Sequence, residues 1–233
     1  MFLLKLFNMK SISYSLFGSD NKYYTGAEKN ILINQKLLPE WETVIYYHPE
    51  MIRNEYIDKL SNFGAKMIDV SSFFFGNRHP KDYPFFWRFI SFFNDGITIS
   101  RDLDSRISER EVEYINRWLQ SNKDYFIIRD HPWHSPVPSG LFGIIRKITD
   151  FENHFNNFIS SSDLKWGTDQ EILYEYMSKI SENDVFYCGY DRLETYIPRD
   201  NKDFFIGIQL DEYDDPTKPS GEQCLQHLKN LNL

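Results

Sequence analysis

The sequence has few cysteines, no long apolar run and no basic segment, and each absence excludes a class of protein. Its two cysteines, Cys188 and Cys224, form neither a C-x-x-C pair nor a cysteine–histidine pattern, which argues against a structural zinc site. So few thiols in 233 residues favour a reducing compartment over a disulfide-stapled secreted fold. We therefore expect a cytoplasmic protein.

The charge balance argues against a nucleic-acid partner. There are 26 basic and 34 acidic side chains, a net charge of −8, without a run of lysine and arginine that could follow a phosphate backbone. Hydrophobic residues make up 41% and aromatic residues 17% of the chain, enough apolar surface to offset chain entropy. A chain of this length is expected to fold as one domain.

The amino terminus begins with the apolar segment MFLLKLF, which Lys5 interrupts. It is short for the core of a signal peptide and far too short to span a membrane, so we expect no transmembrane segment; a brief interfacial anchor stays open. The first strand pattern starts after Met9. We therefore expect residues 1–9 to be an N-terminal extension, dispensable or due to an upstream start codon, and residues 10–233 to be the domain.

Strand-like and helix-like segments alternate along the chain, which is typical of a parallel sheet covered by helices. Apolar and β-branched runs predict the strands, and apolar residues at helical spacing predict the helices. We expect strands at residues 11–18, 43–48, 66–70, 97–100, 124–130, 185–188 and 204–209, and helices at residues 26–38, 50–63, 85–93, from 109 onward, 151–158, 168–180 and 223–231. This order predicts an α/β domain with a central, mostly parallel sheet and helices on both faces.

Two aspartates, Asp102 and Asp104, follow the β-branched run of residues 97–100. Such a run is expected of a buried central strand, and Ser108 with Glu111 forms a capping box that starts the next helix. The aspartates therefore lie at the carboxyl end of a strand, where α/β sheets bind ligands. In an extended segment residues two apart point the same way, so both carboxylates can bind one hard cation, Mg²⁺ or Mn²⁺. A surface ion-pair cluster with the neighbouring arginines is the alternative.

Arg88 is the one charged residue in the apolar segment of residues 85–93. A helix this apolar is expected to be buried between the sheet and its neighbours. A buried guanidinium needs an anionic partner, because an unpaired charge costs several kcal/mol. Arg88 therefore supports a site built around the aspartates that follow it.

Several segments resemble one family, and they occur in its order along residues 10–216. The segment YPFFWRFISFFNDGITISRDLDSR resembles the metal-binding D-x-D region of nucleotide-sugar glycosyltransferases with the GT-A fold. ISYSLFG with YYTGAEKN, RDHPWHSPVPSGLFGIIR, KWGTDQEIL and FFIGIQLDEYDDP are similar to other motifs of the small GT-A domains of large DNA viruses and bacteria. The chain departs from them at PSGLFG, where a GGMWG-like turn is usual, and has no matching histidine as third metal ligand.

The resemblance implies a single GT-A-like, Rossmann-related domain. Its nucleotide-binding half would span about residues 10–105, its acceptor and catalytic half about 106–210, and a C-terminal tail and helix 211–233. It implies a nucleoside diphosphate sugar donor, preferably a UDP-sugar, a glycan or other hydroxyl acceptor, and Mn²⁺ or Mg²⁺ as cofactor. We expect inversion at the sugar carbon, a role in glycan biosynthesis and, for a viral protein, location in the host cytoplasm.

The resemblance also assigns roles at the donor site. Asp104 would bind the metal directly, and Asp102 would bind it directly or through water, or contact the ribose. Arg88 and Arg106 would contact phosphate or orient the aspartates, with structural ion pairs as the alternative. Tyr14 corresponds to a position near the nucleotide base, although an aromatic residue within a strand is more often part of the core.

For the acceptor side, the resemblance points to Asp169 as the base that takes the acceptor proton, with Asp130 as the rival. A carboxylate that stabilises the helix N-terminus is the alternative for Asp169. His131 and Trp133 lie in a proline-rich loop that would contact sugar hydroxyls and stack on a sugar ring, or would be an ordinary exposed loop. The run Phe73–Phe75 is expected in the core, with an acceptor-site lid as the alternative.

Two other functions stay open on sequence grounds. A divalent-metal phosphohydrolase or nucleotidyltransferase also places D-x-D at a strand end, although a P-loop and a strand-one aspartate nucleophile are missing here. A non-catalytic glycan-binding module with a degenerate site would bind its ligand without turnover. We expect a metal-dependent glycosyltransferase.

Overall fold

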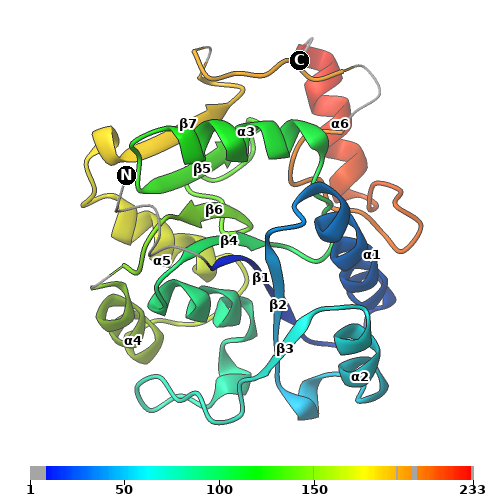
Figure 1. Ribbon diagram of the computed structural model, residues 1–233, viewed down its shortest axis with the longest axis vertical. Coiled ribbons are helices and arrows are strands. Elements are labelled where there is room, and N and C mark those ends of the chain that lie inside the picture. The colour runs from blue at the N-terminus through cyan, green and yellow to red at the C-terminus, as the bar shows by residue number, and fades with distance from the viewer. Residues whose placement is uncertain (1–8, 149, 193, 201–203, 232–233) are drawn as a thin grey trace.

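The computed structural model describes residues 9–148, 150–192, 194–200 and 204–231. The expected N-terminal extension therefore lies, except for Met9, outside the described residues. One seven-stranded sheet runs through the molecule in the order β3-β2-β1-β4-β6-β5-β7, and β6 is antiparallel to both of its neighbours (Figure 1). The predicted fold class, a single α/β domain with a mostly parallel sheet, is confirmed.

The strands are β1 (Lys10–Leu16), β2 (Glu42–Tyr47), β3 (Lys66–Asp69), β4 (Ile97–Arg101), β5 (Tyr125–Arg129), β6 (Leu141–Ile144) and β7 (Val185–Gly189). The α-helices are α1 (Asn21–Leu37), α2 (Glu55–Asn62), α3 (Glu109–Gln120), α4 (Phe151–Ser161), α5 (Thr168–Met177) and α6 (Ser220–Leu231). Four 3-10 helices complete the described elements: η2 (Pro49–Met51), η3 (Pro80–Asp82), η4 (Pro84–Phe93) and η5 (Glu182–Asp184).

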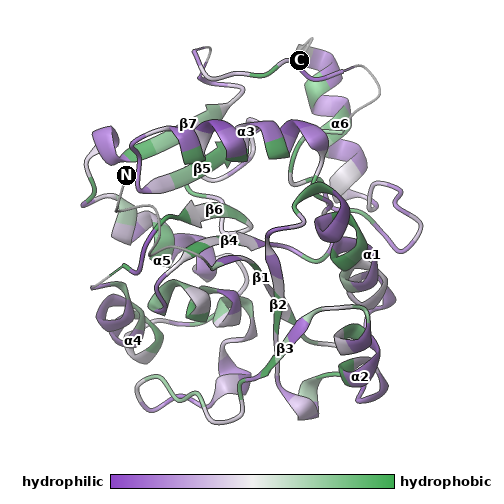
Figure 2. Cartoon of the chain, in the orientation of Figure 1, coloured by the Kyte–Doolittle hydropathy of each residue, from purple (hydrophilic) through white to green (hydrophobic). Residues whose placement is uncertain are grey.

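Both faces of the sheet are covered, as expected. One buried cluster joins the sheet to α1 and α3, with Tyr24 and Trp118 each 0% exposed. The other joins it to η4, α4 and α5 and is rich in phenylalanine, with Phe89 and Phe155 each 0% exposed. Figure 2 shows α1 and α2 with both hydrophilic and hydrophobic residues, as expected of helices that pack on a sheet with one side only.

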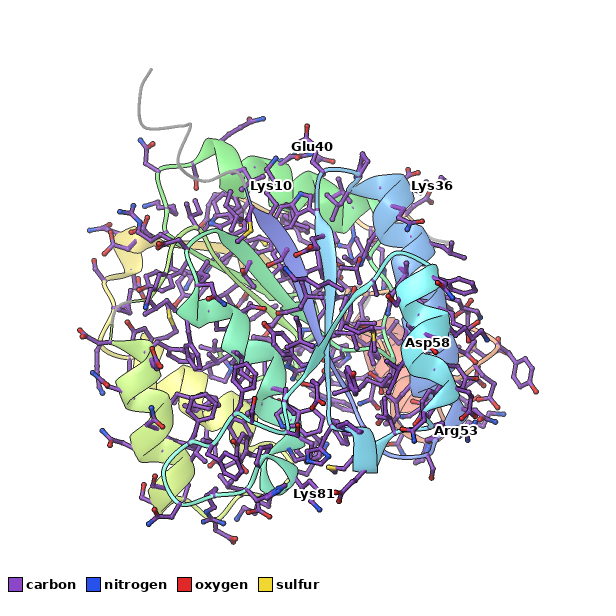
Figure 3. The ribbon with its side chains drawn as sticks, turned by 60° about the horizontal axis from the view of Figure 1, so that its bottom comes forward. Lys10, Lys36, Glu40, Arg53, Asp58 and Lys81 are labelled. Carbon is purple, nitrogen blue, oxygen red and sulfur yellow. The ribbon has the colours of Figure 1, made fainter. Side chains whose placement is uncertain are left out.

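The two ends of the central strands can be followed in Figure 3. Lys10, at the amino end of β1, binds Glu40 at 2.7 Å. Arg53 lies at the opposite end, where its side chain donates to the carbonyl of Ser19, just after β1, at 2.6 Å. Because β1 pairs in parallel with β4, the loop that follows β4 lies at this carboxyl end too.

β4 carries the loop that holds the two aspartates. All five of its residues are buried, as predicted for a central strand. Ser108 begins α3 by accepting from the Glu111 amide at 3.2 Å. The reciprocal half of the capping box is missing, because the Glu111 side chain is fully buried and faces Arg101 at 3.3 Å.

Several element predictions need correction. No strand forms at residues 204–209. Gly207 takes a left-handed conformation, φ +87°, and Phe205 and Ile208 pack in a cluster with Leu228 of α6. Strand β6 was not predicted, since four apolar residues after a proline-rich loop give little local signal. The buried helix predicted at residues 85–93 is present, as a 3-10 helix over residues 84–93. α1 starts five residues earlier than expected, capped by Asp20, which accepts from the Lys22 amide at 3.1 Å.

Among the helices of the described ranges, none combines the length and the apolar character that crossing a membrane would require.

Candidate active site

Asp102 and Asp104 lie at the carboxyl end of β4 and line the same cavity, of about 130 Å³. Leu103 between them is 3% exposed and points into the core, as the alternation of an extended segment predicts. The Asp102 side chain is 46% exposed and that of Asp104 only 8%. One carboxylate therefore faces solvent and the other is buried, although both line the same cavity.

Arg88 of η4 also lines the cavity. It binds Asp102, donates to Asp169 Oδ2 at 2.7 Å and donates to Ser139 Oγ at 2.9 Å. Burial opposes the positive charge, yet the carboxylates of Asp102 and Asp169 raise the pKa of Arg88 above its ordinary value. The buried positive charge of Arg88 is thus balanced by two aspartates, and these belong to two different sequence motifs.

Asp104 is paired with Lys22, whose Nζ lies 3.2 Å from Oδ2. Burial, followed by the negative charge of Asp102, raises the pKa of Asp104 above its ordinary value, and Lys22 opposes this rise. The backbone carbonyl of Asp104 accepts a hydrogen bond from the Leu210 amide at 2.6 Å, which connects the C-terminal tail to this loop. Asp104 is therefore a buried carboxylate with one cationic side chain beside it.

Two glycines allow the surrounding chain to approach the loop closely. A Cβ on Gly140 would lie 1.8 Å from Asp102 Oδ2, and a Cβ on Gly26 of α1 would lie 2.0 Å from the Leu103 carbonyl oxygen. Both distances are far below van der Waals contact. A larger residue at Gly26 would require the loop backbone to move, and one at Gly140 would require the Asp102 side chain to move.

Asp169 lies in the first turn of α5 and faces the same cavity. Gly167, with φ +90°, is the N-cap residue of this helix, and no side chain donates or accepts a hydrogen bond at the cap. Thr168 does not cap the helix, because its hydroxyl accepts from the Lys165 amide at 2.8 Å. Ser139 donates to Asp169 Oδ2 at 2.7 Å, so both side-chain contacts of Asp169 go to one oxygen.

Aromatic side chains absent from the predicted site also line the cavity. They are Trp166, which is 78% exposed, Tyr23, Phe17 and Phe85. Phe17 packs edge-on against Phe85 with ring centroids 5.0 Å apart. The position of Trp166 three residues before Asp169 in KWGTDQ was the one sequence signal that could have drawn attention to it.

Two expected donor-site residues lie outside the cavity lining. Arg106 donates to the carbonyls of Leu103 at 2.9 Å and Ser105 at 3.0 Å, and its Nε donates to Asp214 Oδ1 at 3.1 Å. It thus braces the aspartate loop against the C-terminal tail. Tyr14 is 1% exposed in the core, where its hydroxyl accepts from Asn34 at 3.2 Å and burial raises its pKa to about 12.

The structure also does not bring Asp130, His131 or Trp133 to this cavity. Asp130 binds Arg110 at 3.0 Å and accepts from the Ile206 amide at 2.7 Å. His131 is fully buried and accepts from the Trp133 amide at 3.0 Å, while Trp133 stacks on His227 of α6 with centroids 4.5 Å apart. These residues dock the C-terminal segment onto the proline-rich loop.

A second, larger hollow of about 650 Å³ lies between β1–β4 and the segment of Phe73–Phe75. Phe75 is 7% exposed and packs on Phe155 at 4.8 Å between centroids, as expected of a core residue, whereas Phe74 is 59% exposed. Part of its polar lining is paired internally, as in Tyr46 with Ser91 at 2.8 Å. The smaller cavity, with its convergent charges, is the better candidate site.

Within the described ranges, no three histidine, cysteine, aspartate or glutamate side chains are grouped so as to hold a metal ion. The donor set at the cavity is the pair Asp102 and Asp104. Two carboxylates suit a magnesium-like cation, which keeps water and substrate oxygens as its other ligands. The residues present therefore fit a cation that is completed by a phosphate-bearing substrate.

No protein-family model matches the chain, and no curated protein matches it. Solved structures do share its fold. The 4-diphosphocytidyl-2C-methyl-D-erythritol synthase of Anaerococcus prevotii is similar over 95% of this chain and 99% of its own, with a TM-score of 0.50 and 9% identity.

The glucosyl-3-phosphoglycerate synthase of Mycobacterium tuberculosis is similar over 86% of this chain and 75% of its own, with a TM-score of 0.50 and 8% identity. A further mycobacterial protein matches 78% of this chain and 65% of its own, with a TM-score of 0.51 and 10% identity. At such low identity these likenesses establish the fold alone, which confirms the GT-A-like, Rossmann-related architecture.

Proposed function

We propose that the protein is a metal-dependent glycosyltransferase that moves a sugar from a nucleoside diphosphate sugar, preferably a UDP-sugar, to an acceptor hydroxyl. The observation that carries the proposal is the convergence of Asp102, Asp104 and Asp169 on one cavity at the carboxyl end of β4. Arg88 joins the first and last of these carboxylates. The glucosyl-3-phosphoglycerate synthase of similar fold, whose name indicates that it makes a glucosyl product, adds support at the level of the fold.

In this proposal, Asp104 and Asp102 hold Mn²⁺ or Mg²⁺. When bound, the cation neutralises charge on the departing diphosphate as a Lewis acid. The contact with Arg88 holds the Asp102 side chain in place, and Gly140 leaves room for the Asp102 carboxylate. The open side of Asp102, 46% exposed, faces the space in which the donor phosphates would lie.

Asp169 is the base of the proposed reaction. Arg88 and Ser139 occupy its Oδ2, which leaves Oδ1 to accept the proton of the acceptor hydroxyl. The acceptor oxygen then bonds to the sugar carbon as the bond from that carbon to the diphosphate breaks, and the nucleoside diphosphate leaves with the electron pair. Attack from the side opposite the diphosphate gives inversion, and Trp166 offers an acceptor sugar a ring to stack on.

A nucleotidyltransferase is the second candidate, because the 4-diphosphocytidyl-2C-methyl-D-erythritol synthase is similar in fold over 95% of this chain. Such an enzyme breaks a bond at phosphorus and has no use for a base beside a sugar carbon. A buried carboxylate, Asp169, and an exposed aromatic ring, Trp166, line the same cavity, and this combination favours sugar transfer. The two candidates release different products, which separates them experimentally.

The proposal is tested first by thermal stability against a panel of nucleoside diphosphate sugars, with and without Mn²⁺. A ligand that binds only the folded state raises the midpoint, so the donor can be found without knowing the acceptor. We expect one nucleotide family to raise the midpoint only with metal, and the rise to vanish in Asp104→Asn. Asp124→Asn, which breaks the exposed pair with Arg146, is the matched control and should respond as wild type. Absence of any shift in wild type would contradict the proposal.

A further inference from the structure

Lys22 occupies an unusual place for a lysine. It is the second residue of the seventeen-residue helix α1, where the helix dipole disfavours a positive charge. Its ammonium group nevertheless turns to Asp104 Oδ2 at 3.2 Å, with the two side chains 19% and 8% exposed. The same ammonium lies 4.7 Å from the centroid of the Tyr23 ring. An inward-turned lysine at a helix start is held by its partner, and that partner is Asp104.

The charges around the cavity explain why Asp104 needs this lysine. Three carboxylates, Asp102, Asp104 and Asp169, converge there, and Arg88 binds the first and the last. Lys22 is the cationic side chain that the described structure places on the remaining one. A buried carboxylate without a counter-charge is costly, so Lys22 stabilises the site when no other cation is present.

A divalent cation on Asp104 would compete for the same carboxylate. Ammonium and metal both require the lone pairs of the buried Asp104, and two cations side by side repel each other. The flexible four-carbon stem of lysine lets the ammonium leave. Space is available, because Lys22 also lines an open hollow of about 720 Å³ that contains the carboxylates of Asp20, Asp211 and Asp215.

We propose that Lys22 is the internal counter-ion of Asp104 and that a divalent cation binds the site only by displacing it. This inference rests on the proposed function, because it takes Asp104 as a metal ligand. Lys22 thereby sets the metal concentration at which the donor site becomes competent. Removal of the lysine ammonium should tighten metal binding, whereas removal of an ordinary structural lysine should not.

The test is titration with Mn²⁺ alone, read by calorimetry or by loss of the free Mn²⁺ spin-resonance signal, on wild type and Lys22→Met. We expect Mn²⁺ to bind Lys22→Met about tenfold more tightly, as expected for loss of a partly buried competing charge. Lys29→Met is the matched control, because Lys29 lies two turns along the same helix and binds Asp214 at 2.7 Å. Its Mn²⁺ affinity should equal that of wild type.

A second comparison ties the effect to Asp104. In an Asp104→Asn background, Lys22→Met should leave any residual Mn²⁺ affinity unchanged, because the contested carboxylate is gone. Equal or weaker Mn²⁺ binding by Lys22→Met, with metal binding intact in wild type, overturns the counter-ion role and leaves the proposed function standing. Absence of Mn²⁺ binding in both proteins overturns the metal role of Asp104 together with this inference. Thermal unfolding of each variant establishes that it is folded.

Discussion

Arg88 donates to Asp169 at 2.7 Å and thereby joins two residues that lie 81 positions apart in the sequence. The same guanidinium binds Asp102, so one buried arginine connects the loop after β4 with the start of α5. The proposed donor and acceptor sides are thus held in a fixed relation. The predictions below test that relation and the groups around it.

Arg88→Lys should fold with reduced stability and lose at least about a hundredfold in turnover, because one ammonium cannot replace a guanidinium that binds Asp102, Asp169 and Ser139 at once. Steady-state kinetics with the identified donor measure the loss. Lys81→Met, which removes an exposed pair with Glu50, should behave as wild type. Wild-type turnover by Arg88→Lys would show that the bridge has no functional role.

Gly140→Ala should weaken donor binding, because the new methyl group would lie 1.8 Å from Asp102 Oδ2 and must push that carboxylate aside. Asp102 is partly exposed, so its side chain can move with little loss of fold stability. We expect about a tenfold rise in the dissociation constant of the metal–donor complex, measured by calorimetry. Unaltered donor affinity in a folded Gly140→Ala protein would remove Asp102 from the donor site.

Trp166→Ala should raise the KM for acceptor about tenfold, the range expected for loss of an aromatic stacking partner. Slow hydrolysis of the donor by water should stay unchanged, since the residue contacts neither Asp102 nor Asp104 in this account. Trp133→Ala, which removes the other large exposed tryptophan, provides the comparison and should leave the acceptor KM at the wild-type value. A changed donor KM in Trp166→Ala would move this side chain to the donor side.

The contribution of Glu111 to stability should fall as pH rises through the range in which this side chain titrates. Burial raises the pKa of Glu111 from 4.5 to about 7, with Arg101 opposing and Asp130 adding to the rise. The folded state therefore binds the proton more tightly than the unfolded state, so this contribution is present at low pH and is lost as pH rises toward 7. We expect the contribution of Glu111 to the free energy of unfolding to fall by about 1 kcal/mol between pH 6 and pH 8, equivalent to about 2–4 °C in Tm.

Glu111→Gln isolates this effect, because glutamine keeps the shape of the protonated side chain but cannot ionise. The change in unfolding free energy from pH 6 to pH 8 should differ between wild type and variant by the amount assigned to Glu111. Chemical denaturation at both pH values gives the comparison. An identical pH dependence in wild type and variant would show that Glu111 does not titrate in this window.

Much of the fold follows from local patterns. The β-branched run before Asp102 predicts a buried strand, and the lone Arg88 in an apolar segment requires an anionic partner. The strand expected at residues 204–209 fails because Gly207 turns the chain and α6 covers its side chains, a tertiary effect without local signature. The identity of Arg88's second partner, Asp169, could not be read from the sequence because they are distant along the chain.

The candidate site, like the fold, could be predicted from the sequence only in part. Residue type and position after a strand suffice to single out Asp102 and Asp104, but not Lys22, whose role depends on where a helix start lies in space. Asp130, His131 and Trp133 have suitable chemistry, yet the structure uses them to bind Arg110 and the C-terminal segment. Tyr14 is buried in the core, because α1 covers the strand that carries it.

Phosphorus-31 NMR of the purified protein with Mg²⁺, which does not broaden phosphorus signals as paramagnetic Mn²⁺ does, and the nucleoside diphosphate sugar found by the stability panel tests the central claim most directly. Transfer of the sugar to an acceptor or to water breaks the bond at the sugar carbon. The account therefore predicts a nucleoside diphosphate as the phosphorus product, and its loss in Asp104→Asn and Asp169→Asn. Appearance of a nucleoside monophosphate with sugar 1-phosphate, or of nucleoside triphosphate when pyrophosphate is added, would contradict it and assign the chemistry to phosphorus.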